Sequence, residues 1–357
     1  MKSLDPTLFQ GQLEGKALGL FELTNGQGFQ VALSNYGARI LQILTPDRWG
    51  GIDDVVLGYP SLDAIMAARS SVGAFIGRYA GRIGQAQFTL DGQLYRLHAN
   101  DGPHCLHGGL EGLRFKALRV EQVQSDRLLM SYRFVDGEMG FPGELELKLE
   151  YRVTAQNALE ISYEAHAIGK SSLASFAPHP YFNLNGSGSG SAMDHEVMVH
   201  SSQYVEVNES LVATGRLIST HRSAFDLSAR RPLSQHLALW NLNGFDDCFL
   251  VDSDNPAGAQ TVVPDLKLCA EVFAPRTGRA MAVWSSEPAM QFYTGLNPLA
   301  HIGHGPGKEG RFYLQQEGLC FEPQAYPNAP NCPAFPLPLI EPGKPQRGKT
   351  VYEFNIF

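Results

Sequence analysis

The sequence has few cysteines and no paired cysteine motif. Five are scattered over 357 residues, and no two form a C-x-x-C pair. An odd, dispersed set argues against a disulfide framework and against a structural zinc site. Cysteine usage of this kind is typical of a reducing compartment, so we expect a cytoplasmic protein.

Long apolar runs and basic clusters are missing as well. No stretch approaches the roughly 20 apolar residues that span a bilayer, and the opening "MKSLDPTLFQGQLEG" lacks the apolar centre of a signal peptide. Lys and Arg number 28 against 36 Asp and Glu, so the net charge is −8. A nucleic-acid-binding protein would need a basic face. We therefore expect no membrane partner and no nucleic-acid partner.

Common catalytic and metal motifs are also lacking. The sequence contains no G-x-S-x-G and no pair of histidines at H-x-x-x-H spacing, and the glycine-rich segment "GPGKEGR", 305–311, lacks the G-K-[ST] ending of a phosphate loop. We therefore expect neither a cofactor nor a metal.

What is present is a series of β-strand patterns. Period-2 alternation of apolar and polar residues marks "RLLMSYRFVD", "GELELKLEYRVT", "ALEISYEAHA", "LKLCAEVFAP", "AMAVWSS", "AMQFYTG" and "TVYEFNI". The segment 87–97, "QFTLDGQLYRL", predicts a hairpin whose turn is Asp91-Gly92. Helical patterns are few, and the best is 61–68, with Ser61 as its N-cap. "NGSGSGS", 185–191, suggests a flexible loop beside a site.

This pattern predicts an all-β protein, a large antiparallel β-sandwich with a few short helices. We find no internal repeat and no linker, so residues 1–357 are expected to form a single domain.

Polar side chains suited to catalysis or ligand binding gather in a few short segments among glycines and aromatics. "GRYAGRIGQAQF" carries Arg78 and Arg82, "NDGPHCLHGGLEG" carries two histidines, and "FAPHPYFNL" sets one histidine between prolines. Glu322 follows the apolar run "GLCF", which places it at the end of a buried strand, where a carboxylate needs partners or a raised pKa. "GFDDCFL" and "MQFYTGLN" complete the set. The candidate site residues are His179, Glu322, Arg82, His107, Asp246 and Gln291.

One imidazole and one carboxylate suit acid/base work on a neutral, hydroxylated substrate. Tyr181, Phe182 and Phe292 suit the apolar face of a sugar ring. The residues therefore indicate a carbohydrate-active protein without choosing its reaction.

Taken in order, the segments resemble the aldose 1-epimerase (galactose mutarotase) family over nearly the whole chain. That family is written with GR-x-x-NRI, LHGG, NHSYFNL-like, GFDH-like and GL-x-x-E-x-Q segments. Here they read "GRYAGRI", "LHGG", "PHPYFNL", "GFDD" and "GLCFEPQ". The resemblance implies a galactose mutarotase-like supersandwich and an isomerase that interconverts the anomers of a free aldohexose such as glucose or galactose. It implies Glu322 as general base and His179 as general acid, with Arg82, His107, Asp246 and Gln291 contacting the sugar.

Several positions depart from the family's pattern. Gly81 replaces an asparagine, and so does His104, while Pro178 and Pro180 replace the asparagine and serine that flank the catalytic histidine; Asp247 replaces the histidine of the GFDH-like segment. The catalytic pair is intact, so the reaction is retained, but the preferred sugar is left open.

The implied roles set opposite demands on the pair. Glu322 is expected to be ionised, and His179 to be protonated with its pKa raised by a nearby carboxylate. Two alternatives are a hexose-6-phosphate 1-epimerase, for which Arg78 and Arg82 would bind the phosphate, and a non-catalytic sugar-binding protein on the same fold. The chain is expected to be a monomer or homodimer with a small-molecule sugar as its substrate.

Overall fold

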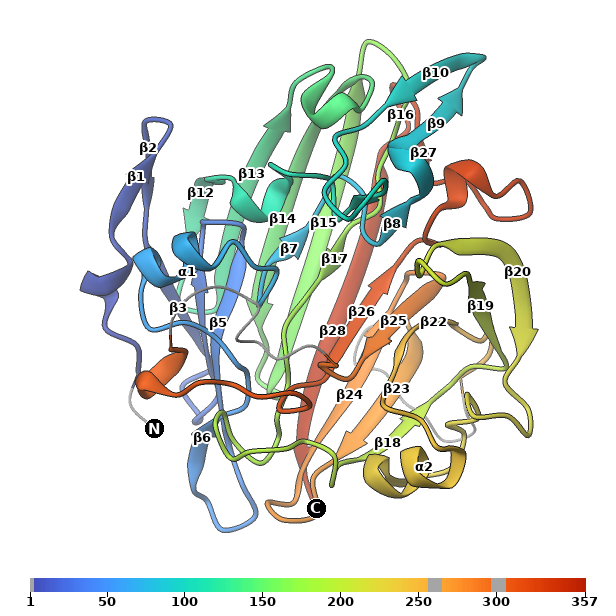
Figure 1. Cartoon of the computed structure of the whole chain (residues 1–357). Coiled ribbons are helices and arrows are strands. Elements are labelled where there is room, and N and C mark those ends of the chain that lie inside the picture. Colours follow the sequence, from blue (N-terminus) through green and yellow to red (C-terminus); the bar gives the residue numbers. More distant parts are fainter. Residues whose placement is uncertain (1–2, 256–264, 297–305) are drawn as a thin grey trace.

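The computed structural model describes residues 3–255, 265–296 and 306–357. Within these ranges the chain is built almost entirely of strands, and every pair of named strands is antiparallel (Figure 1). The all-β prediction is confirmed, and so are the strand patterns named above.

The largest sheet in the described part of the chain has nine strands, in the order β12-β13-β14-β15-β28-β24-β23-β18-β21. Its long central strands alternate buried and outward-facing residues; in β14 the inward positions hold three leucines, a tyrosine and a valine. Each such side chain contributes about 1.5–3 kcal/mol by leaving water. The strands are β12 (Arg119–Val123), β13 (Arg127–Phe134), β14 (Glu144–Val153), β15 (Ala158–Ile168), β28 (Gln346–Ile356), β24 (Arg279–Ser285), β23 (Lys267–Phe273), β18 (Glu196–Val199) and β21 (Arg231–Pro232).

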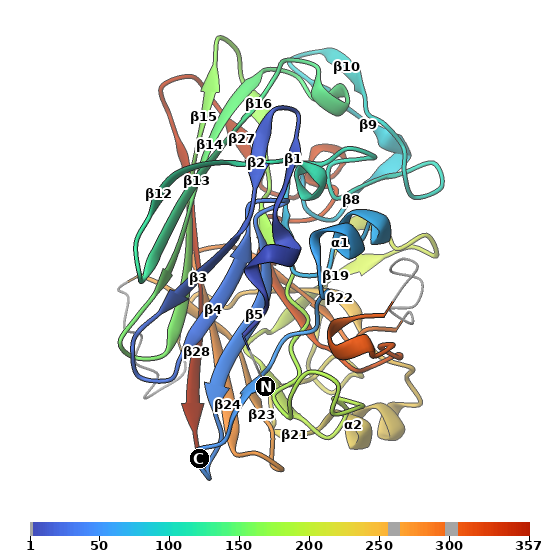
Figure 2. The same cartoon turned by 90° about the vertical axis from the view of Figure 1, so that its left-hand side faces the viewer.

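Two smaller sheets face this one (Figure 2). The first has the order β3-β4-β5-β6 and is formed by β3 (Leu20–Thr24), β4 (Gln30–Ser34), β5 (Arg39–Pro46) and β6 (Ile52–Asp54). The second has the order β20-β19-β22-β25-β26 and is formed by β20 (Ala213–Ser219), β19 (Gln203–Val207), β22 (Asp246–Leu250), β25 (Ala289–Tyr293) and β26 (Cys320–Gln324). One continuous apolar core draws residues from all three sheets.

Short strand pairs connect the layers and carry the segments of interest. They are β1 (Gly11–Leu13) with β2 (Lys16–Leu18), β7 (Phe75–Ile76) with β17 (Ala177–Pro178), β8 (Arg82–Ile83) with β11 (Cys105–Leu106), β9 (Gln87–Leu90) with β10 (Gln93–Arg96), and β16 (Ser172–Leu173) with β27 (Leu339–Ile340). The predicted hairpin is β9–β10, and both turn residues, Asp91 and Gly92, have positive φ as expected.

Helices are short. α1 (Leu62–Ala68) begins at Ser61, whose side chain accepts a hydrogen bond from the Ala64 amide, as predicted. α2 (Leu233–Trp240) was not predicted from the sequence. The 3₁₀ turns are η1 (Pro6–Phe9), η2 (Gly84–Ala86), η3 (Leu113–Phe115), η4 (Glu138–Gly140), η6 (Lys308–Gly310) and η7 (Ala329–Asn331). No helix in the described ranges is long and apolar enough to cross a membrane.

The glycine- and serine-rich segment at 185–191 forms a loop, as predicted, and part of this loop is buried. Asn185 and Ser187 are buried, and the Asn185 side-chain amide donates to both carboxylate oxygens of Asp194. The segment does not line the cavity described below. Composition predicted the loop, but it does not report the side-chain hydrogen bonds that pack part of it.

Candidate active site

A cavity of about 210 Å³ opens where the β22–β25–β26 edge of the five-stranded sheet meets the segments around β8, β11 and β17. Its volume suits one small molecule such as a single sugar. The six candidate residues come from six separate stretches of sequence, and all of them line it: Arg82, His107, His179, Asp246, Gln291 and Glu322.

Strand register brings three of these side chains to one face. Gln291 of β25 lies directly between Cys248 of β22 and Glu322 of β26. Asp246 precedes Cys248 by two residues, so its side chain points to the same side of the sheet. The alternation of the strands therefore places both acidic groups and the amide in the cavity.

The backbone N–H and C=O groups of His179 itself hold the chain in place between the two prolines. The His179 amide donates to the Ala74 carbonyl at 2.9 Å, and the Gly73 amide donates to the His179 carbonyl at 2.9 Å. Pro178 and Pro180 have no N–H to compete for these partners. They are buried and do not line the cavity, so they act on the imidazole through its backbone.

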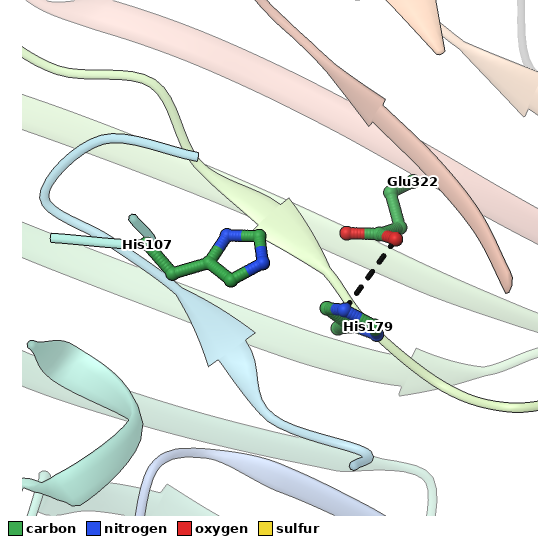
Figure 3. A group of neighbouring side chains, drawn as sticks. All are labelled: His107, His179 and Glu322. Carbon is green, nitrogen blue, oxygen red and sulfur yellow. Dashed lines mark ion pairs between the residues drawn. The ribbon is translucent and has the colours of Figure 1, made fainter. Parts of the chain in front are cut away.

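The imidazole of His179 and the carboxyl of Glu322 face each other (Figure 3). Nε2 of the imidazole lies 3.5 Å from Oε1 of the carboxyl, and the two residues are 5% and 2% exposed. The imidazole stacks on the Tyr181 ring at 5.1 Å between centroids and meets the His107 ring edge-on at 5.4 Å. Oε2 of Glu322 is buried and has no hydrogen-bond partner among the described residues, so it is available to a ligand.

Burial governs the protonation of this pair. It lowers the pKa of His179 to about 3, with the charges of Arg114 and Arg39 acting in the same direction. It raises the pKa of Glu322 well above the usual value, and the nearby carboxylate of Asp246 adds to that rise. The expected raised pKa of His179 was wrong, because loss of solvation outweighs the attraction of the carboxylate.

His107 has a defined donor. Its Nδ1 accepts a hydrogen bond from the Gly81 amide at 3.3 Å, so in the neutral ring the proton resides on Nε2. Burial lowers the pKa of His107 well below its ordinary value, and the charges of His179, Arg114 and Arg82 lower it further. The ring is therefore neutral and offers one N–H to a ligand.

Arg82 and Asp246 are each held by a neighbour. Nε of Arg82 donates to Oδ2 of Asp101 at 2.7 Å, which leaves its terminal nitrogens for a ligand. Nε2 of Gln291 donates to Oδ1 of Asp246 at 2.8 Å. Burial raises the pKa of Asp246, while the charge of Arg82 and the Gln291 hydrogen bond oppose that rise.

Arg78 is placed differently from the sequence-based expectation for a phosphate site. It is buried away from the cavity and donates to the carbonyls of Leu173, Pro142 and Gly143 at 2.8–3.3 Å. It also bonds Ser172. Arg82 is the only Lys or Arg that lines the cavity among the residues the structure describes.

Of the three aromatic residues expected to face the sugar, one lines the cavity. Tyr181 lines the cavity, whereas Phe182 and Phe292 belong to the apolar core. Phe292 stacks on Phe321, 4.9 Å away between ring centroids. The error follows from alternation, because Phe292 is adjacent to Gln291 on β25 and so faces the opposite side.

Three departures from the family's pattern have different consequences. His104 is buried outside the cavity, and its Nδ1 accepts a hydrogen bond from the Gln85 amide at 3.1 Å, so it supports a turn. Gly81 lines the cavity itself. Asp247 lies outside the cavity lining, half-buried, with its pKa raised by burial to about 6.

Sequence reasoning assigned no role to several other lining residues. Gln324 shares a face with Glu322 by the period of the strand, and that was the available signal. Leu106, Val207, Leu211 and Pro327 arrive from distant loops, for which local patterns give no signal.

The cavity also contains a group with metal-ligand chemistry. Ligand atoms of His107, His179 and Glu322 all lie within 4.8 Å of one another. The two histidines are far apart in sequence, so motif spacing could not detect this group. Two imidazoles and a carboxylate are ligands that Zn²⁺ accepts.

Comparisons with known proteins identify the family of the chain. The family model described as aldose 1-epimerase matches residues 19–353. Galactose mutarotase of Bos taurus is 35% identical over 336 residues, covering 94% of each chain, and aldose 1-epimerase of Escherichia coli is 29% identical over 96% of each. The crystal structure of an aldose epimerase homologue from C. elegans, 26% identical, superimposes with a TM-score of 0.85 and covers 95% of this chain and 99% of its own. The chain belongs to the aldose 1-epimerase family of isomerases.

Proposed function

We propose that His179 and Glu322 carry the proton transfers by which this isomerase interconverts the α and β anomers of a free aldohexose. Glu322 takes the proton of the C1 hydroxyl while His179 gives one to the ring oxygen. The C1–O5 bond breaks, its electron pair goes to O5, and C1 becomes an aldehyde. Rotation about C1–C2 followed by closure on the other face reverses both transfers. Each well-placed acid or base typically contributes about 10²–10⁴-fold.

The buried pair needs a single proton for this chemistry. The pair can hold this proton in two arrangements. In one, Glu322 is protonated and His179 is neutral; in the other, His179 is protonated and Glu322 is ionised. Burial favours the uncharged arrangement, and mutual attraction at 3.5 Å favours the ionic one. A bound sugar that donates its C1 hydroxyl to the carboxylate and accepts at its ring oxygen favours the ionic form. After ring opening the proton has moved from one partner to the other, and the total is unchanged.

The remaining cavity residues orient the sugar. His107 offers its Nε2–H, Arg82 offers its terminal N–H groups, and Asp246 accepts from a hydroxyl while Gln291 holds it in place. Fixing the ring in this way raises the rate, because the bound sugar is already oriented and loses less entropy on reaching the transition state. The proposed reaction changes no oxidation state and transfers no group, so we propose that it needs no cofactor or metal.

The substrate is proposed to be an unphosphorylated aldohexose such as glucose or galactose. A phosphate would need a cluster of cations, and Arg78 is already used by backbone carbonyls outside the cavity. The Bos taurus relative, which is named a galactose mutarotase, supports galactose as one candidate. Gly81 changes the cavity wall, so glucose is an equal candidate.

The composition and the free cysteines support a proposal for the cellular compartment and the partners. All five cysteines are free and buried, which supports a reducing compartment, and we propose the cytoplasm. The net charge of −8 supports the absence of a nucleic-acid partner. We propose a monomer or a homodimer.

The observation that carries this proposal is the imidazole–carboxyl pair, 3.5 Å apart, in a cavity the size of one sugar. Polarimetry of freshly dissolved α-D-glucose, α-D-galactose and α-D-glucose 6-phosphate tests it. The expected result is a protein-dependent acceleration on the free sugars and a much smaller one on the phosphate. Binding of the sugars without acceleration would instead identify a sugar-binding protein, and a preference for the phosphate would identify a hexose-6-phosphate 1-epimerase.

A further inference from the structure

The side chain of Gln324 lies in the cavity with no assigned role. On β26 it follows Glu322 by two residues, so both side chains point to the same side of the sheet. At about 3.3 Å of rise per residue, the two positions are about 6.6 Å apart along the strand. That separation is similar to the length of one sugar ring with its hydroxyls. A sugar held with C1 at Glu322 therefore extends to Gln324.

The Gln324 amide has no strong hydrogen-bond partner. The residue is 1% exposed, and neither Oε1 nor Nε2 has a partner of ordinary hydrogen-bond geometry among the described residues. Its one polar contact there is the thiol of Cys248, which is a weak hydrogen-bonding group and leaves most of the amide's capacity unused. Buried amides are almost always paired, because an unpaired one loses its water without compensation. An amide left in this state at a cavity wall indicates that a ligand completes it.

Gly81 lies beside the amide on the cavity wall, with φ at +76°. A Cβ at position 81 would lie 3.5 Å from Nε2 of Gln324 and 3.1 Å from Cβ of Pro327, so a side chain there would occupy this end of the cavity.

We propose that Gln324 is a specificity-determining residue whose amide binds a sugar hydroxyl remote from C1, in the space that Gly81 leaves. This inference rests on the proposed function. A carboxamide presents one acceptor and two donors without charge, which matches a hydroxyl or two adjacent hydroxyls. The sugar is thereby held at both ends: C1 at the proton-transfer pair and a distant hydroxyl at the amide.

The test replaces the amide without changing the length of the side chain. Gln324→Met retains an unbranched chain and removes both polar atoms. The matched control is Gln122→Met, which makes the same change at an exposed position of β12. We measure kcat and KM with glucose and galactose, and then with the 2-, 3-, 4- and 6-deoxy analogues of whichever sugar is turned over faster.

On the parent sugar, kcat/KM is expected to fall by about 5- to 100-fold, chiefly through KM, because two neutral hydrogen bonds are lost. On the one deoxy analogue that lacks the contacted hydroxyl, Gln324→Met is expected to have no effect. Gln122→Met is expected to behave as the wild type throughout. An equal loss on every analogue, or no loss on the parent sugar, would overturn the inference.

Stability separates a ligand contact from a structural role. Without sugar, Gln324→Met is expected to melt at the wild-type temperature or above it, because no unpaired buried amide is left. A fall of several degrees would show that the amide supports the fold and would also overturn the inference. Gln324→Leu repeats the comparison with a second apolar side chain. A wild type that fails to accelerate anomerisation would refute the proposed function itself, whereas a normal Gln324→Met on an active wild type refutes only this inference.

Discussion

The protonation of the His179–Glu322 pair makes a quantitative prediction about pH. With a pKa of about 3, only about 1% of His179 is protonated at pH 5, so the pair rarely carries a second proton. An ordinary imidazole with a pKa of about 6.5 would be about 97% protonated at that pH. The raised pKa of Glu322 keeps the single shared proton on the pair well above the usual titration range of a carboxyl. We therefore expect kcat/KM to show no acid limb between pH 5 and pH 7.

The assay is the initial rate of anomerisation of α-D-glucose by polarimetry, at sugar concentrations far below KM, with the spontaneous rate subtracted at each pH. At low sugar concentration kcat/KM reports the free enzyme, and its limbs belong to the pair as a whole. A half-maximal point near pH 6.5 on the acid limb would refute the conclusion that burial controls the imidazole. Asp247, whose pKa is about 6, is the nearby group that could imitate such a limb, and Asp247→Asn is the control that identifies it.

Three further predictions concern stability, substrate orientation and metals. Burial raises the pKa of Glu287 to about 7 from 4.5. The contribution of this group to stability is therefore complete below pH 4.5 and is lost as the pH rises through 7. Glu287→Gln should raise the free energy of unfolding in urea by up to about 3 kcal/mol at pH 8 and by much less at pH 5. An equal change at both pH values would contradict this. Arg82→Ala should lower kcat/KM by at least about tenfold, whereas Asp101→Asn, which removes only a half-exposed partner, should lower it by less than about fivefold. The opposite order would show that the arginine does not orient the sugar. Dialysis against EDTA should leave the rate unchanged; a loss restored by Zn²⁺ would assign the three side chains of Figure 3 as a metal site.

The strands were accessible from sequence because their pattern is local. Period-2 alternation identified β13, β14, β15 and β28 without reference to the rest of the chain. α2 was not found, because eight residues joined to short polar segments give a weak periodic pattern. The pairing of β15 with β28, more than 180 residues apart, lies beyond any local pattern.

The six candidate residues lie together in one cavity, but the environment of some of them was not predicted. Ordered motifs led to these six among the lining residues, and strand alternation explains why Gln291 faces the cavity while Phe292 does not. The direction of the His179 pKa was wrong, since burial is a property of the assembled layers. The state of the Gln324 amide could not be predicted either, because its neighbours at the cavity wall, Gly81 and Pro327, come from distant parts of the chain.

The central claim is that the carboxyl of Glu322 moves a proton during anomer exchange. The most direct measurement is saturation transfer by NMR between the α and β anomeric protons of glucose, through the open-chain form, with wild type and Glu322→Gln at equal concentration. The amide keeps the size of the side chain and can still bind a hydroxyl, so sugar binding should persist while enzyme-dependent exchange falls by about 10²–10⁴-fold. Exchange at near the wild-type rate in Glu322→Gln would contradict the mechanism.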